Sequence, residues 1–88
     1  MTDAPKIEFP QLEYPIRVIA DAHEQLRDEV VSVVKRHDPD FREQTVEVVE
    51  SRQGAYCSVR MVICATGEAQ LKALHEELRE NPLVKMVL

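Results

Sequence analysis

The fold is decided by the stretch Tyr56-Cys57-Ser58-Val59-Arg60-Met61-Val62-Ile63-Cys64-Ala65. It is rich in β-forming residues and contains no glycine or proline, so it predicts the longest strand of the molecule. Alternate side chains of a strand point to opposite faces. The inner face is apolar, and the outer face mixes apolar with polar residues: the inner set is Cys57, Val59, Met61, Ile63 and Ala65, and the outer set is Tyr56, Ser58, Arg60, Val62 and Cys64. We therefore expect one buried face and one face that is open to contact.

Three more strands are predicted on either side of this stretch. Residues 14–21 and residues 44–51 alternate apolar with polar positions, and residues 83–88 are dense in β-forming side chains. The turn Arg52-Gln53-Gly54 joins the second strand to the long strand, since glycine readily adopts the positive φ that a tight turn requires. The positions expected to face the core in the first two strands are Ile16, Val18, Ala20, Val46 and Val48.

Two helices are predicted between the strands. Asp21 and Glu24 have the spacing of a capping box, so we expect the first helix to begin there and to end at Asp38-Pro39. Thr66 is placed to cap the second helix, which Asn81-Pro82 ends. Each helix needs one apolar stripe to pack on the sheet. The stripes are Leu26, Val30, Val33, Val34 and His37 in the first helix, and Leu71, Leu74 and Leu78 in the second.

The order of these elements, strand, helix, strand, strand, helix, strand, is the split βαβ pattern. Two right-handed crossovers place the strands in the order 4-1-3-2, in an antiparallel sheet with both helices on one face. We therefore predict an α+β fold, a ferredoxin-like βαββαβ sandwich, as a single domain over residues 14–88. Residues 1–13, with Pro5 and Pro10 among charged side chains, are expected to be an N-terminal arm.

The sheet face opposite the helices is left open in this topology, and we expect it to be the working surface. Protein contacts are predicted for Ile19, Val49, Tyr56, Arg60, Val62, Lys85 and Val87, with Arg17, Thr45, Glu47 and Ser58 on the same face. The last strand lies at a sheet edge and carries only one charged residue. An edge strand with so little charge to repel another strand favours pairing with one. We therefore expect a protein partner or self-association as a homodimer, the alternative being a monomer whose arm folds back to cover the edge or the open face.

The charge balance excludes several partners. Eleven Lys and Arg against sixteen Asp and Glu give a net charge of −5, which repels nucleic-acid phosphates and anionic lipids. The sequence shows no basic start followed by an apolar stretch, so we expect no signal peptide, and no apolar run is long enough to span a membrane. We therefore expect a cytoplasmic protein with no nucleic-acid partner and no membrane partner.

Residues with catalytic or metal-binding chemistry are scattered along the chain. No two of the three histidines have the i, i+4 spacing of metal ligands, and Cys57 and Cys64 lie on opposite faces of one predicted strand, where they are expected to be packing residues. We predict no catalytic residue, no metal and no cofactor. A ligand, if one binds, is expected at the start of the first helix, where backbone amides attract an anion. The residues concerned are Asp21, Ala22 and His23.

Two resemblances to modules of the same strand order bear on function. The segment from Arg52 to Val59 resembles in part the RNA-recognition motif, but Tyr56 is its only aromatic residue and the chain is acidic, so RNA binding is disfavoured. The strand order also resembles that of ACT-type metabolite-binding modules, whose ligand loop follows the first strand. ACT modules commonly have a glycine in that loop, whereas this chain has Asp21-Ala22-His23.

From Tyr14 onward the sequence resembles the YbeD-like family of small uncharacterised bacterial proteins. The resemblance is carried by Val33-Val34-Lys35-Arg36-His37, Gly54-Ala55-Tyr56-Cys57-Ser58-Val59, Ala65-Thr66, Glu76-Glu77-Leu78 and Val84-Lys85-Met86-Val87-Leu88. It implies a ferredoxin-like, ACT-like fold without an established activity, and the gene neighbourhood of the family implies a link to lipoate metabolism. We therefore expect a non-enzymatic regulatory or protein-interaction module, the alternative being an ACT-like domain that binds an amino acid or a lipoyl compound.

Overall fold

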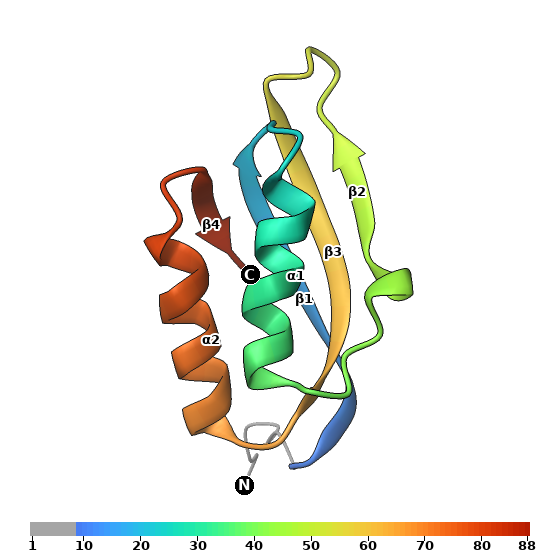
Figure 1. Ribbon diagram of the computed structural model, residues 1–88, viewed down its shortest axis with the longest axis vertical. Coiled ribbons are helices and arrows are strands. Elements are labelled where there is room, and N and C mark those ends of the chain that lie inside the picture. Colours follow the sequence, from blue (N-terminus) through green and yellow to red (C-terminus); the bar gives the residue numbers. More distant parts are fainter. Residues whose placement is uncertain (1–8) are drawn as a thin grey trace, which may run out of the picture.

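The computed structural model describes residues 9–88. Along the chain it contains β1 (Gln11–Asp21), α1 (Leu26–His37), the short 3-10 helix η1 (Glu43–Thr45), β2 (Glu47–Glu50), β3 (Tyr56–Ala65), α2 (Glu68–Glu80) and β4 (Val84–Val87). The strands form one antiparallel sheet in the order β2-β3-β1-β4, and both helices lie on the same face of it (Figure 1). The predicted ferredoxin-like sandwich, with strand order 4-1-3-2, is confirmed.

The hydrophobic core lies between the two helices and the inner face of the central strands. The inner positions predicted for these strands are buried, namely Ile16, Val18 and Ala20 of β1 and Cys57, Val59, Met61, Ile63 and Ala65 of β3. The helices bury Leu26, Val30, Val31 and Val34 of α1 and Leu74 and Leu78 of α2. In α1, Val31 is buried where the predicted stripe had Val33, which is half-buried. Because four valines make α1 a weak helix in isolation, burial of this face supplies most of its stability.

The start of α1 differs from the prediction. Asp21 is the last residue of β1, and the helix begins at Leu26 without a side-chain cap from its N-cap residue. The ring of His23 acts instead, because its Nδ1 accepts a hydrogen bond of 3.0 Å from the backbone N–H of Gln25. The predicted capping box is therefore wrong. Asp21 cannot cap the helix because the residues after it form the connection from the sheet to the helical layer.

Thr66 does not cap α2 either. Its backbone N–H donates to Oε1 of Gln70 at 2.8 Å, and Gly67 occupies the N-cap position. The same Gln70 side chain donates to the backbone oxygens of Cys64 at 3.0 Å and His37 at 2.8 Å. One amide therefore joins the end of β3, the end of α1 and the first turn of α2.

The strand ends also differ from the prediction. β1 begins at Gln11, so residues 11–13, predicted as arm, belong to the sheet; residues 1–8 of the predicted arm lie outside the described residues. β2 is shorter than predicted, because η1 occupies residues 43–45. The turn before β3 is as predicted: Gly54 has a φ of 70° and its N–H donates to the oxygen of Ser51 at 3.0 Å.

Asp38 is a buried polar residue that the sequence did not single out. Only 6% of it is exposed, and its Oδ2 accepts a hydrogen bond of 3.0 Å from the backbone N–H of Cys64. This contact lies beyond the end of β2, because β2 pairs with β3 only as far as Arg60. Asp38 thus provides an acceptor for a backbone group that the neighbouring strand does not reach.

Candidate functional site

The open face of the sheet carries two rows of side chains. One crosses all four strands, and the other crosses β2, β3 and β1 and ends at Leu88, just after β4. The strand register places Val49, Ser58, Ile19 and Met86 side by side in the first row, from β2 to β4. Val49 is 40% and Met86 51% exposed, although both are large apolar residues. Since the helices lie on the other face, nothing in the described part of the chain covers this row (Figure 1).

The second row is charged at its centre. It runs from Glu47 through Arg60 and Arg17 to Leu88, which exchanges backbone hydrogen bonds of 2.8 and 3.1 Å with Arg17. These residues, with Pro15, Thr45 and Val62, line a shallow hollow in the face. Within residues 9–88, the basic side chains that lie within ion-pair distance of a carboxylate are Arg27, Lys35, Arg36, His37 and Lys85. Neither Arg17 nor Arg60 is among them.

Most residues predicted for the interface lie on this face, but the position predicted for Val87 is wrong. Val87 pairs with buried Val18 and packs against the core, whereas Met86 pairs with Ile19 and faces outward. The reason is an irregularity in β4, where the register with β1 shifts between the partners of Ile19 and Ala20. The other predicted residues on the face itself are Val49, Tyr56, Arg60 and Val62. At the end of the face, Nζ of Lys85 lies 3.3 Å from Oδ2 of Asp21.

The predicted ligand residues at the end of β1 are brought only partly together. Ala22 and His23 line a second hollow, on the helix side of the sheet, between α1 and β2. Asp21 points elsewhere, to the ion pair with Lys85. The other residues around this hollow are Glu24, Leu26, Arg27, Val48, Glu50 and Cys57. The hollow exists because the helices do not cover β2, all four residues of which are exposed.

Cys57 lies at the base of this second hollow and is buried. Burial raises the pKa of its thiol above the ordinary value of 9.0, and the negative charges of Glu50 and Asp21 raise it further. A thiol with a raised pKa is protonated and a poor nucleophile at neutral pH. Cys64 lies on the opposite face, and both cysteines are free. The geometry supports packing roles for the pair.

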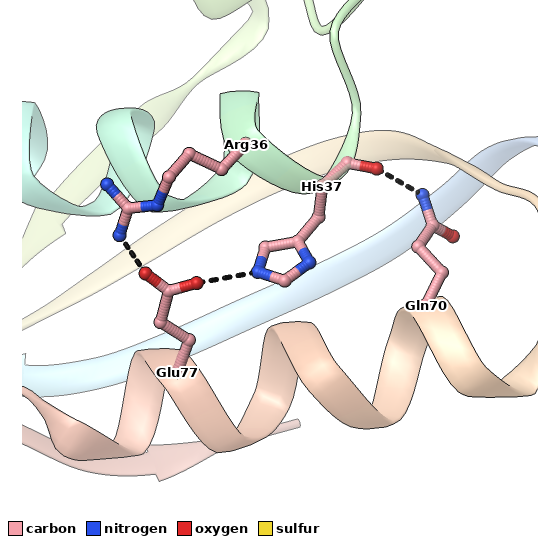
Figure 2. Close-up of polar contacts among 4 residues, drawn as sticks. All are labelled: Arg36, His37, Gln70 and Glu77. Atoms are coloured by element: carbon pink, nitrogen blue, oxygen red, sulfur yellow. Dashed lines mark hydrogen bonds and ion pairs between the residues drawn. The ribbon is translucent and has the colours of Figure 1, made fainter.

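The main polar cluster ties the two helices together and was not predicted. One carboxylate oxygen of Glu77, on α2, lies 2.7 Å from Nε2 of His37. The other accepts a hydrogen bond from the guanidinium of Arg36, as Figure 2 shows. Gln70, about two turns earlier on α2, donates to the backbone oxygen of His37 (Figure 2). All of these groups join α1 to α2, so the cluster is accounted for by helix packing.

His75 is the other histidine of the helical layer. It is half-buried, and its Nε2 is buried without a hydrogen-bond partner among residues 9–88. Burial lowers its pKa below 6.5, and the positive charge of Arg79 lowers it further. The ring is therefore neutral at neutral pH.

The described residues form neither a metal-binding cluster nor a membrane-spanning helix. Among residues 9–88, no group of three or more His, Cys, Asp and Glu lies close enough to hold a metal ion. Across the same part of the chain, no helix has the length and the apolar character that crossing a membrane demands.

Comparison with solved structures supports the fold. A protein of H. pylori, known from its solution structure, matches 99% of this chain and 90% of its own, with a TM-score of 0.72 at 17% identity. The ACT domain of GTP pyrophosphokinase from Chlorobium tepidum matches 88% of this chain and 95% of its own, with a TM-score of 0.63 at 15% identity. At these identities the likeness shows the fold alone.

Comparison of sequences identifies the family. A UPF0250 protein of Azotobacter vinelandii is 50% identical and one of Nitrosomonas europaea 39% identical, each over the full length of both chains. The family model described as "Protein of unknown function (DUF493)" matches residues 4–88. The predicted resemblance to the YbeD-like proteins is thereby confirmed. The chain belongs to the DUF493 family of proteins of unknown function.

Proposed function

We propose that this chain is a non-enzymatic regulatory module of the cytoplasm that acts by binding protein, and that the open face of its sheet is the binding surface. One observation carries the proposal. Four large apolar side chains lie exposed on a face that no helix covers, namely Val49 at 40%, Tyr56 at 51%, Val62 at 40% and Met86 at 51%. Exposed apolar side chains gathered on one face of a small domain are typical of a contact site.

The first partner that we propose is a second copy of the chain, joined through β4. This strand is a sheet edge, and Met86 within it and Leu88 just after it are 51% and 59% exposed. Leu88 directs its hydrogen bonds to Arg17, so the N–H and C=O of Val87 point away from the sheet by the alternation of an antiparallel pair. The opposite edge, β2, would bring Glu47 and Glu50 of two copies close together. Pairing through β4 would join the two open faces into one larger surface.

Sedimentation velocity over a range of protein concentrations tests this pairing. Val87→Pro removes the outward N–H and is expected to shift the protein to the monomer, whereas Val87→Thr retains the N–H and should leave the dimer in place. Far-ultraviolet circular dichroism of both variants reports whether they are folded. A wild-type protein that stays monomeric at high micromolar concentration, or a folded Val87→Pro variant that dimerises as the wild type does, contradicts the proposal.

A second candidate function is the binding of a small molecule in the hollow between α1 and β2. The charges there favour a zwitterion over a simple anion. Glu24 and Glu50 can receive an ammonium group, and Arg27, which also contacts Asp28 and the backbone oxygen of Glu43, can receive a carboxylate. His23 already accepts the N–H of Gln25, which removes one of the helix amides predicted to hold an anion. An amino acid fits these charges, and lipoyl compounds enter as candidates through the family resemblance.

Thermal unfolding in the presence of amino acids and lipoyl compounds tests the second candidate. A ligand at a hundred times its Kd stabilises the native state by about 2.7 kcal/mol. Ala22→Leu fills the hollow and should abolish the shift, whereas Ala73→Leu on the exposed side of α2 should preserve it. No shift with any of these compounds, or an equal shift in Ala22→Leu, argues against a small-molecule function.

A further inference from the structure

Two arginines lie directly opposite each other at the centre of the open face. Arg17 of β1 pairs with Arg60 of β3 in the register of the two central strands, and both side chains are exposed. Like charges opposite each other in an antiparallel pair repel. Glu47 faces Arg60 from β2, yet no ion pair joins them, and the ion pairs within residues 9–88 all involve other basic side chains. Within residues 9–88, neither of these two neighbouring arginines forms an ion pair.

The surroundings of these arginines restrict what they can bind. The row on one side contains Val49, Ile19 and Met86, and the row on the other side contains Val62 and Pro15. A group that approaches the guanidiniums therefore brings its neighbours against apolar side chains. Guanidinium groups recognise carboxylates with two parallel hydrogen bonds, and such bonds strengthen as apolar neighbours exclude water.

We propose that Arg17 and Arg60 form a site for the carboxylate of an acidic side chain on a partner protein, in an extended segment whose other side chains are apolar. The inference rests on the proposed function, because it names the chemistry of the partner that the open face takes. One carboxylate would meet two cations here. A polyanion would instead meet a chain of net charge −5, with Glu47 in the same row, so nucleic acid and anionic membranes fit poorly.

Nuclear magnetic resonance of the full isotope-labelled chain tests the site with a defined probe. The probe is a peptide in which one glutamate lies between valine and alanine residues, and the matched peptide has glutamine in place of the glutamate. The glutamate peptide should shift the Nε–H signals of Arg17 and Arg60 together with the methyl signals of Ile19 and Val62. Arg60→Gln should weaken its binding by about tenfold, the loss expected for one charge-assisted interaction.

Two variants sharpen the test. Arg52→Gln removes an exposed arginine in the turn between β2 and β3, away from the site, and should leave the affinity unchanged. Arg17→Glu reverses the charge of one of the two side chains. This variant should bind a lysine peptide of the same pattern better than it binds the glutamate peptide. Both positions are exposed, so each variant is expected to fold.

Several results would overturn the site. They are equal affinity for the glutamate and glutamine peptides, equal weakening by Arg52→Gln and Arg60→Gln, and no shift with either peptide. A free anion would be the true ligand if acetate alone shifted the arginine signals at the same concentration. A single-stranded oligonucleotide that bound more tightly than the peptide would replace the protein partner by nucleic acid. If both peptides shifted only the signals of the apolar rows, the carboxylate site would be refuted but the proposed function would stand. The sedimentation experiment tests that function independently.

Discussion

Replacing His75 by leucine is expected to stabilise the protein. The Nε2 atom of the ring is buried without a partner among residues 9–88. A buried polar atom in this state costs about 1–3 kcal/mol, and because the side chain is half-buried we take the lower end, about 1 kcal/mol. In a domain of this size, that gain corresponds to a rise in Tm of about 4–8 °C. Lys72→Leu, at an exposed position of the same helix, controls for the effect of leucine itself.

The same replacement should alter the dependence of stability on pH. Burial and Arg79 lower the pKa of His75 in the native state below the ordinary 6.5, so the unfolded chain takes up a proton first as the pH falls. The free energy of unfolding of the wild type therefore decreases below pH 6.5, down to the lowered native pKa. Urea unfolding at about pH 7.5 and about pH 5.5 measures the effect, and the advantage of His75→Leu should be larger at the lower pH. An equal difference at both pH values, or a loss of stability at the higher one, would refute the reasoning.

Two further predictions concern buried groups. Asp38→Ala leaves the N–H of Cys64 without its acceptor and should lower the free energy of unfolding by about 2 kcal/mol in urea, whereas Asp40→Ala, exposed nearby, should change it by less than about 0.5 kcal/mol. A loss in Asp38→Ala no greater than in Asp40→Ala would show that the hydrogen bond contributes little. Cys57, buried and with a raised pKa, should react with iodoacetamide more slowly than Cys64 in the native protein, as peptide mass spectrometry can measure. Equal rates, with unfolding excluded, would contradict the burial of Cys57.

The central strands could be predicted from the sequence because their pattern has one interpretation. In β3 every second residue from Cys57 to Ala65 is apolar, and a shift by one position would expose all of them. The helix starts could not be predicted in the same way. Asp21 offers the spacing of a cap, but the hydrogen bonding of β1 extends to this residue, and His23 makes the contact that the pattern assigned to Asp21.

Contacts between distant parts of the chain left no signal in the sequence. His37 and Glu77 are separated by forty positions, and Asp38 and Cys64 by twenty-six; only the packing of α2 and β3 against the end of α1 brings them together. The exchange of Val87 and Met86 has a similar origin. A local irregularity in β4 reverses which side chains of this short strand face the core, and no property of its residues predicts where the irregularity occurs.

The arginine pair shows why the function of this surface depends on register. The alternation in β1 and β3 predicts that Arg17 and Arg60 each lie on the open face, but it does not predict that they are neighbours. That follows from the pairing of Val18 with Val59, which fixes every other partner along the two strands. A pairing displaced by two residues would keep the same core face buried and would set Arg60 opposite Ile19 or Pro15 in place of Arg17. The structure instead brings two like charges together at the centre of the face, at a cost of a few tenths of a kcal/mol to about 1 kcal/mol. A carboxylate supplied by a partner would remove this cost, so the free energy of binding would include the relief of a repulsion that the isolated chain must tolerate.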